Sequence, residues 1–280
     1  MALSTATRAT IVHPTDFSPG GGSALAHALA MTLASKSQLC LLQVRENEDA
    51  FFSPTQGLRQ VRDLLARWGR LGKDATYDHW ESERDIRVSN MSIAARNARA
   101  GILEFLEDRP CELVVLATYE HKALARWLDI SVPRSVLRQA RIMSLFLREG
   151  GRGFVDRDSG ALRLKKLLVP IDGAVNCIGA LQRIQRMRKL VSSDTAIQLF
   201  HVGDRAPVVA DERGRPLTQP ILVRQGRVVD SILNAAGDLG VDAIAMPTAG
   251  RHGLLDAARG STTARILEEG RWPLLAVPVG

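Results

Sequence analysis

The chain has 280 residues, of which 45% are hydrophobic and 24% are charged, and its formal net charge is +7. No apolar run approaches the roughly 18 residues that a membrane span requires, and the N-terminus lacks the apolar core of a signal peptide, so we expect a cytoplasmic protein. Basic residues are interspersed with acidic ones and aromatic residues make up only 5%, which disfavours nucleic-acid binding.

The first part of the chain alternates predicted strands and helices. Apolar runs predict strands over residues 10–16, 38–44, 113–118 and 142–147. The first of these ends in Pro-x-Asp at Asp16 and leads to an amphipathic helix around Leu25 and Leu29. A second helix contains apolar residues at helical spacing from Leu58 to Leu71, and a third begins at Ser131. Such alternation is typical of βαβ units and of a parallel sheet covered on both faces.

The middle of the chain, residues 148–160, is rich in glycine and charge and has no apolar periodicity. This composition predicts a linker. We therefore place one domain at residues 1–149 and a second at residues 162–280.

The second part of the chain repeats the first. Predicted strands cover residues 166–172, 197–202, 243–248 and 274–279, and predicted helices begin near Ile178 and at Ser261. The first strand again ends in Pro-x-Asp, here at Asp172. The sequence therefore predicts an α/β protein made of two tandem, doubly wound, five-stranded parallel-sheet domains of the Rossmann-like type.

Two segments of the second part differ from the first. Residues 203–220, rich in Gly, Pro and charge, replace the helix at 58–71, and we interpret them as a shortened connection, with a mobile loop over a ligand as the alternative. The helix after Ile178 carries a dense basic group, which we interpret as its solvated side: Arg183, Arg186, Arg188 and Lys189.

The cysteines and histidines give no sign of a metal site. Cys40 and Cys111 fall inside predicted strands and Cys177 stands far from both, so we expect buried free thiols rather than disulfides or metal ligands. The histidines show neither HxxxH nor HExxH spacing.

A glycine-spaced segment near the C-terminus indicates an anion site. Gly250 follows the predicted strand at 243–248, and nine residues later Gly260-Ser261-Thr262-Thr263 opens a helix. The amide groups of a helix start lack internal partners and the helix dipole favours negative charge there. Glycine would let the main chain approach a phosphate closely. The sequence therefore predicts a phosphate cradle.

The same site would involve the loop after the first strand of the second domain. In doubly wound sheets, ligands bind at the carboxyl ends of strands where the strand order reverses. Asp172 would accept hydrogen bonds from a base or a ribose, or alternatively cap the following helix. The segment is neither a GxxxxGK[ST] loop nor a GxGxxG motif, so NAD is disfavoured.

These residues resemble the universal stress proteins over nearly the whole chain. Nucleotide-binding members of that family carry Gly-x2-Gly-x9-Gly-[Ser/Thr] after the fourth strand and Pro-x-Asp after the first. The chain matches this pattern from Gly250 onward but has Pro247 at the first glycine. The resemblance implies an adenine-nucleotide site at Pro170, Ile171, Asp172, Val202, Met246, Pro247, Thr248, Gly250, Gly260, Ser261 and Thr262. The implied ligand is ATP, AMP or ADP, with Mg²⁺ as an optional companion.

The corresponding segment of the first domain departs from the pattern. Its three glycine positions are lost, Glu120 would bring a carboxylate to the phosphate path and Ile130 a branched side chain. We therefore expect no ATP in the first domain. In this family the final strands often pair antiparallel, so we expect residues 274–279 and 142–147 to pair, either within one chain or in a homodimer, with the pairing fading near Pro278.

The expected function is that of an ATP-binding stress-response sensor or regulator rather than an enzyme. His252 and Asp256 could reach a phosphate tail, but no spacing connects them to a nucleophile. The alternative is a nucleotide-free interaction or scaffold module of the same fold, and slow ATP hydrolysis is a remote third option. An adenylate-forming enzyme would need a phosphate motif in the first strand–helix turn, which the Asp172 loop lacks.

Overall fold

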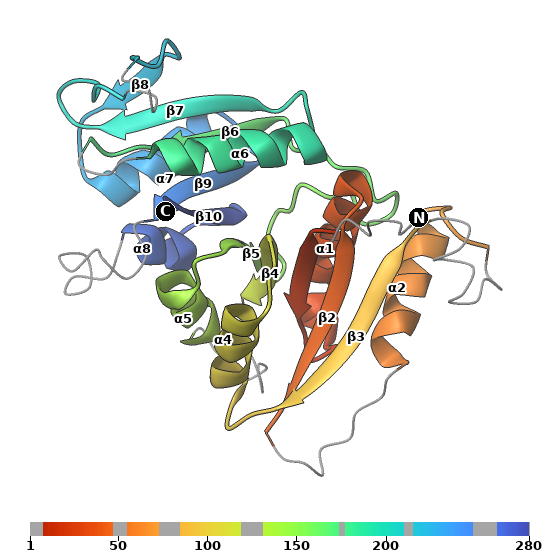
Figure 1. Ribbon diagram of the computed structural model, residues 1–280. Coiled ribbons are helices and arrows are strands. Elements are labelled where there is room, and N and C mark those ends of the chain that lie inside the picture. The colour runs from red at the N-terminus through yellow and green to blue at the C-terminus, as the bar shows by residue number, and fades with distance from the viewer. Residues whose placement is uncertain are drawn as a thin grey trace, which may run out of the picture.

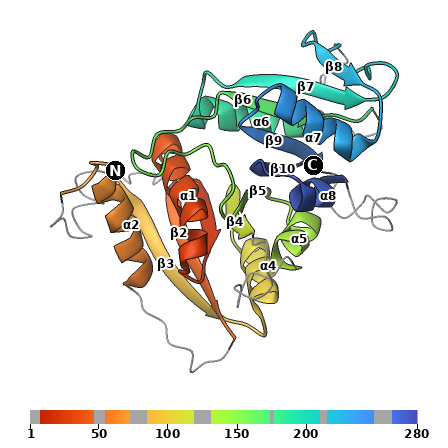
Figure 2. The same cartoon turned by 180° about the vertical axis from the view of Figure 1, so that it is seen from behind.

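The computed structural model describes residues 8–46, 55–72, 85–118, 131–173, 177–209, 215–248 and 262–279. These residues form a ten-stranded sheet with helices on both faces (Figures 1 and 2). The strands are β1 (Thr10–Pro14), β2 (Gln38–Arg45), β3 (Arg87–Ala94), β4 (Leu113–Thr118), β5 (Met143–Arg148), β6 (Lys166–Pro170), β7 (Ala196–Val202), β8 (Ile221–Arg224), β9 (Ala243–Thr248) and β10 (Leu274–Pro278). The helices are η1 (Pro19–Gly21), α1 (Gly22–Ser35), α2 (Gln56–Arg67), α4 (Ala98–Asp108), α5 (Ser131–Gln139), α6 (Ile178–Val191), α7 (Val228–Asp238) and α8 (Thr262–Glu269).

The sheet consists of two halves with the same internal order. Across the sheet the strands run β3-β2-β1-β4-β5-β10-β9-β6-β7-β8. Within each half all strand pairs are parallel, and the order reverses between β1 and β4 and again between β6 and β9. This confirms the predicted doubly wound α/β fold with five strands in each half. The domain boundaries at 149 and 162 stay a prediction.

The two halves join through their last strands. β5 and β10 pair antiparallel within the one chain, in the register Leu274 with Phe146, Leu275 with Leu145 and Ala276 with Ser144. The pairing between these two strands stops before Pro278, as expected for a residue without an N–H, while Pro278 still lies beside Thr248 of β9. The sheet edge that each half would otherwise leave open is thus covered by the other half.

Apolar side chains pack on both faces of the sheet because successive strand residues point to opposite sides. Ile11 of β1 belongs to the core under α1, α2 and α6, whereas its neighbour Val12 belongs to the core under α4, α5, α7 and α8. The first core is continuous from one half to the other and includes Leu145 of β5 and Leu275 of β10.

The third strand and the helix after it in each half were not located from the sequence. β3 and β8 are the two edge strands, and their side chains are mostly half-buried or exposed, which weakens the apolar pattern. The helices α4 and α7 follow them. The described part of the connection between β7 and β8 contains no helix, which agrees with the predicted inequality of the two halves.

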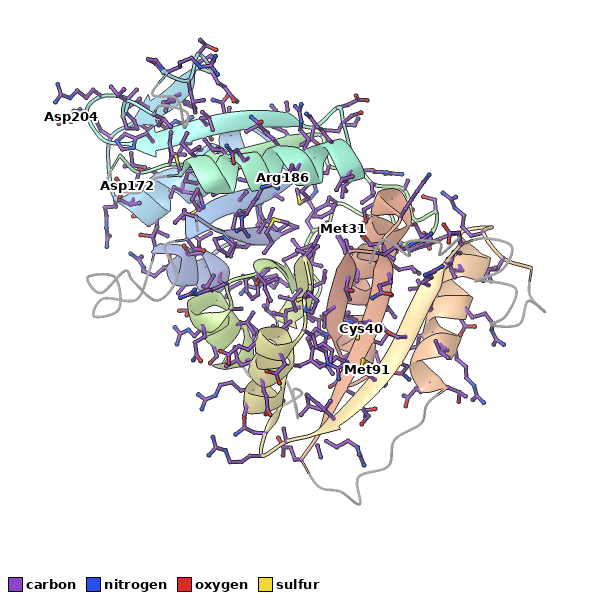
Figure 3. All side chains as sticks on the ribbon, in the orientation of Figure 1. Met31, Cys40, Met91, Asp172, Arg186 and Asp204 are labelled. Atoms are coloured by element: carbon purple, nitrogen blue, oxygen red, sulfur yellow. The ribbon has the colours of Figure 1, made fainter. Side chains whose placement is uncertain are left out.

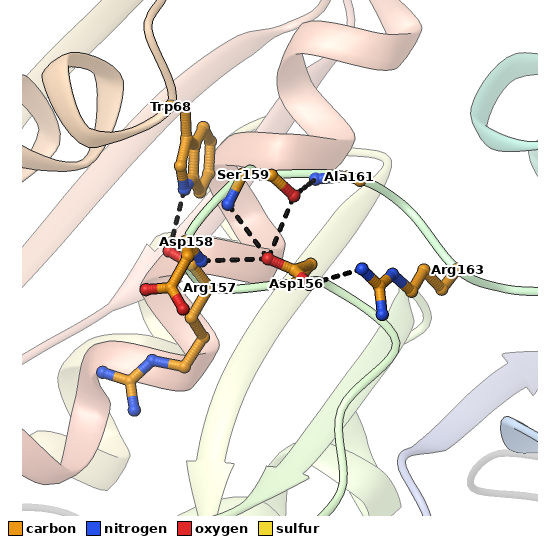
Figure 4. A network of polar contacts seen from close by, with 7 residues as sticks. All are labelled: Trp68, Asp156, Arg157, Asp158, Ser159, Ala161 and Arg163. Atoms are coloured by element: carbon orange, nitrogen blue, oxygen red, sulfur yellow. Dashed lines mark hydrogen bonds and ion pairs between the residues drawn. The ribbon is translucent and has the colours of Figure 1, made fainter.

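The connection between the halves is more than a linker, which corrects the sequence-based interpretation. Residues 154–163 fold back on themselves, with a bridge between Val155 and Leu162. The Asp156 carboxylate accepts hydrogen bonds from the backbone N–H groups of Asp158 and Ser159 at 3.1 and 3.0 Å and forms an ion pair with Arg163 (Figure 4). These bonds lower the pKa of the Asp156 carboxyl group.

Long-range contacts hold this turn, residues 154–163, against the first half. The Trp68 indole Nε1 donates a hydrogen bond to the carbonyl of Arg157 at 3.0 Å (Figure 4). On α1, the His27 Nε2 accepts hydrogen bonds from the backbone N–H groups of Phe154 and Val155, so its Nδ1–H donates to the Ser23 carbonyl. Phe154 and Val155 are themselves buried. A Gly- and charge-rich segment is therefore a fixed part of the core.

Gly160 is the position where this turn tolerates no side chain. Its φ of +70° is a left-handed conformation, and a Cβ would lie 2.4 Å from the buried Trp68 ring. We expect Gly160→Val to reduce the free energy of unfolding by about 2–3 kcal/mol, as measured by urea denaturation.

Gly150 provides the control for this prediction, because its φ of +68° is equally left-handed but a Cβ there would meet nothing within 4 Å. Gly150→Val should cost only the backbone strain, about 1 kcal/mol. Equal losses in the two variants would show that the contact with Trp68 does not matter.

The cysteines are free thiols, as predicted, but one location was wrong. Cys40 lies buried in β2 and Cys177 lies buried at the start of α6, whereas Cys111 precedes β4 and is half-buried. Burial raises the pKa of all three thiols, that of Cys111 to about 12. Such thiols are poor nucleophiles at neutral pH.

Candidate functional site

The carboxyl ends of β6, β7 and β9 meet at one edge of the second half. β6 pairs with β9 on one side and with β7 on the other, all parallel, so the loops that follow the three strands leave the sheet in the same direction. The order of strands reverses between β6 and β9 because the chain crosses from β6 to β7 over α6 and returns to β9 through α7. This is the position at which doubly wound sheets bind ligands.

The predicted residues of the β6 loop lie at this edge. Pro170 ends β6, Ile171 is buried and Asp172 is exposed beyond it. The backbone of Ile171 is held from both sides, since its N–H donates to the Phe200 carbonyl at 2.8 Å and its carbonyl lies 2.9 Å from His201 Nδ1. The loop that presents Asp172 thus starts from a fixed position.

Asp172 does not act as the N-cap of the next helix. α6 begins at Ile178, and the N-cap position belongs to Cys177, five residues after Asp172. The structural alternative that the sequence left open for this carboxylate is therefore wrong. Figure 3 shows Asp172 at the end of the second half where Asp204, which follows β7, also lies.

The predicted residues of β9 lie on the neighbouring strand. Met246 is buried, and Pro247 and Thr248 are half-buried at the strand's end. The carbonyl of Thr248 accepts a hydrogen bond from Val279 N–H at 3.0 Å, which fastens the end of β9 to the end of β10. Pro247 offers no N–H here, so the backbone donor that a glycine would supply is missing.

The remaining predicted residues are partly placed. Val202 is the last residue of β7 and is half-buried, and Thr262 is the first residue of α8. Gly250, Gly260 and Ser261 lie outside the described residues, as do His252 and Asp256. The described chain therefore leaves the sheet at Thr248 of β9 and returns at the N-terminus of α8, which lies on the side where the second-half strands end (Figure 1).

Sequence reasoning overlooked His201 and Asp204 beside this site. His201 holds the Ile171 carbonyl, and the Asp204 carboxylate accepts a hydrogen bond from the Gln225 side chain at 2.9 Å. Both residues stand at the carboxyl end of β7, and that position was the signal that could have identified them. Among the described residues, no group of three or more His, Cys, Asp or Glu side chains could hold a metal ion.

The same edge of the first half is built differently. The Asp16 carboxylate, which corresponds to Asp172, accepts a hydrogen bond from Ser18 N–H at 2.9 Å within its own turn. His13, the residue before Pro14 in β1, is buried, and its Nδ1 lies 2.9 Å from the Val115 carbonyl of β4. Residues 119–130 lie outside the described residues, so the expected loss of ATP binding in this half stays a prediction.

The fold and the carboxyl edge of its sheet define a doubly wound α/β protein with a reversal of strand order in each half. A model of the universal stress protein family matches residues 7–148 and 205–278. Because the match covers most of the chain, the protein belongs to the universal stress protein family. The intervening residues 149–204, which include β6 and α6, fall outside the matched segments.

Solved structures of similar length share the fold over nearly the whole chain, and a shorter one aligns with half of it. A universal stress protein from Archaeoglobus fulgidus DSM 4304 is 14% identical, with a TM-score of 0.58 and coverage of 97% of this chain and 98% of its own. A functionally unknown protein from Pseudomonas aeruginosa PAO1 is 15% identical, with a TM-score of 0.61 and coverage of 98% and 93%. A universal stress protein in complex with cAMP covers 50% of this chain and 97% of its own, with 17% identity and a TM-score of 0.33.

A comparison with curated proteins gives no match. Within the part of the chain that the structure describes, every helix is too short or too polar to cross a membrane.

Proposed function

We propose that the second half of this protein binds an adenine nucleotide, ATP in the first place, at the carboxyl edge of β6, β7 and β9. The observation that carries the proposal is the meeting of Asp172 and the ends of β7 and β9 at the strand-order reversal, from which the chain leads through the Gly-x9-Gly-Ser motif to the start of α8. Membership of the universal stress protein family supports it.

Each part of the site has a role in this proposal. Ile171, Val202 and Met246 offer apolar surface to the purine, and the Asp172 carboxylate accepts hydrogen bonds from the ribose hydroxyls or the base amino group. The backbone amides around Gly250 and Gly260 and the start of α8 bind the phosphates, where the helix dipole favours negative charge. Thr262 adds a hydroxyl at that helix start. The proposal allows a Mg²⁺ ion on the phosphate tail.

The protein would act as a sensor or regulator whose nucleotide occupancy reports a cellular state, located in the cytoplasm. We propose no catalytic residue. A phosphate-release assay with excess ATP tests this statement. Sustained turnover would show that the site has a catalytic role.

Thermal melting with nucleotides tests the proposal. A ligand that binds only the folded protein stabilises it by about 2.7 kcal/mol at 100 times its Kd. We expect a clear rise in Tm with saturating ATP and little change with NAD. Mass spectrometry of the supernatant released by heating purified protein should detect ATP or AMP.

A pair of variants locates the binding. Gly260→Val should abolish the ATP-induced rise in Tm, because a branched side chain would occupy the space through which the phosphates pass. Ile130→Val, at the corresponding position of the first half, is the control and should leave the rise unchanged. If no adenine nucleotide raises the Tm of the unaltered protein, the nucleotide-free scaffold module is the better description.

A further inference from the structure

A pocket lies where the two halves meet, away from the proposed nucleotide site. Its volume is about 330 Å³, and it is lined by the C-terminal turns of α1 and α6 and by the starts of β1, β4 and β5. Figure 3 shows Met31 on α1 and Arg186 on α6, both in the lining, on adjacent helices at this junction. Its size falls within the range of small-molecule sites. None of its lining residues belongs to the proposed nucleotide site.

Three arginines from two separate elements line the pocket. Arg183 and Arg186 lie one turn apart on α6, and Arg141 precedes β5. The structure gives none of the three an ion pair or a hydrogen bond with any other described residue. Glu112 is the one acidic residue in the lining, so the pocket has an excess of positive charge. The guanidinium groups can therefore donate hydrogen bonds to an anion bound in the pocket.

The rest of the lining is largely apolar. Met31, Leu113 and Met187 are buried below the surface, and Leu190 at the rim is 52% exposed although it is a large apolar residue. The Cys111 thiol, also in the lining, stays protonated at neutral pH because its pKa is raised to about 12. The apolar surface that water reaches beside the arginines is that of Leu190 and of the half-buried Ile142, Met143 and Val191, and its exposure costs free energy.

The internal repeat shows that the two halves differ at this place. The separation in sequence between the starts of β1 and β6, Thr10 and Lys166, equals that between the starts of α1 and α6, Gly22 and Ile178. The same separation relates His27 of α1 to Arg183 of α6, so these two residues occupy corresponding positions. His27 is covered by the buried connection through Phe154 and Val155. Arg183 has no such cover among the described residues, and the pocket opens beside it.

We propose that this pocket binds a small organic anion with an apolar body, of the type of a medium-chain carboxylate, whose acid group lies between Arg141, Arg183 and Arg186. The apolar chain would lie against Leu190 and the half-buried Ile142, Met143 and Val191. An inorganic anion would leave this apolar surface exposed to water, and a neutral apolar molecule would leave the arginines without a counter-charge. The proposal does not depend on nucleotide binding in the second half.

Fluorescence of 1-anilinonaphthalene-8-sulfonate, an apolar ring system with one sulfonate, provides the probe. We expect saturable binding to the folded protein at neutral pH. Octanoate should displace the probe at concentrations at least tenfold lower than octanol or inorganic phosphate, because only octanoate satisfies both parts of the pocket. ATP should not displace it. Displacement by octanol and octanoate at equal concentrations would overturn the proposal, as would displacement by ATP.

Variants on α6 connect the binding to this pocket. The double variant Arg183→Gln/Arg186→Gln should bind the probe at least tenfold more weakly, the effect expected for losing charge-assisted hydrogen bonds. Lys189→Gln, which removes one positive charge from the same helix outside the lining, is the control and should bind normally. Leu190→Glu, which alters an exposed rim residue and places a carboxylate beside the arginines, should also weaken binding.

Melting temperatures close to that of the unaltered protein would show that these variants are folded. Equal probe affinity in the double variant and the control would overturn the proposal. So would a dimer in sedimentation that forms through this face and excludes the probe, because the occupant would then be a second copy of the chain.

Discussion

Lowering the pH from 7 to 4 should reduce the free energy of unfolding by about 6 kcal/mol through two buried histidines. Burial lowers the pKa of His13 and of His27 from 6.5 to about 4. Below pH 6.5 the unfolded chain therefore binds protons that the folded chain does not, and stability falls until the folded pKa is reached. Each histidine contributes about 3 kcal/mol over this window. Urea denaturation at half-unit pH steps measures the loss.

A variant at His27 distinguishes the titration of this histidine from a general change in the protein's charge balance at low pH. Protonation would place an N–H on His27 Nε2, opposite the two backbone N–H groups of Phe154 and Val155 that it now accepts. His27→Gln keeps an acceptor at the end of the side chain but cannot be protonated, so it should remove about half of the pH dependence. An unchanged slope in this variant would mean that His27 is not the group that titrates.

Phe146→Ala should cost about 3–5 kcal/mol and should weaken both halves of the molecule, not only its own. Phe146 is almost fully buried in β5 and lies opposite Leu274 of β10. Because the sheet continues through this pair, a cavity here loosens β4 and β9 through their partners β5 and β10. Hydrogen exchange measured segment by segment should show reduced protection in both halves.

Leu222→Ala is the control for Phe146→Ala, because Leu222 lies half-buried in the edge strand β8. It should cost less than half as much and should affect the second half alone. A loss of protection confined to the first half in Phe146→Ala would show that the two halves unfold independently.

The central strands could be predicted from the sequence because they are buried on both faces. The apolar runs 113–118 and 243–248 match β4 and β9 in both bounds. The edge strands could not be located, since β3 and β8 carry polar or half-exposed side chains. An edge strand has one neighbour and partial cover, and its sequence resembles that of a loop.

The connection was misread, and the surroundings of the basic helix were missed, for a different reason. Glycine at 153 and 160 indicates a flexible segment in isolation, but these glycines allow close contact with His27 and Trp68, which are distant in the chain. The helical pattern of α6 correctly separates its apolar face from Arg183 and Arg186. It carries no information that α1 of the other half packs beside those arginines, and so could not reveal the pocket.

At the proposed nucleotide site, the edge of the sheet could be predicted from the sequence. The pairing of β6 with β9 and β7 brings Asp172, Thr248 and Val202 to the same edge, as the alternation of strands and helices predicted. His201 escaped notice because its role is to fasten the Ile171 carbonyl, a contact with no sequence signature.

The antiparallel junction of β5 and β10 makes one polypeptide the equivalent of a pair of related subunits. Two identical subunits must present the same residues at both sides of their contact, whereas a fused pair can differ. Here one side of the contact carries His27 under the chain's own connection, and the other carries Arg183 beside an open pocket. Covalent fusion thus lets the two copies diverge at this contact while it keeps them in a ratio of one to one.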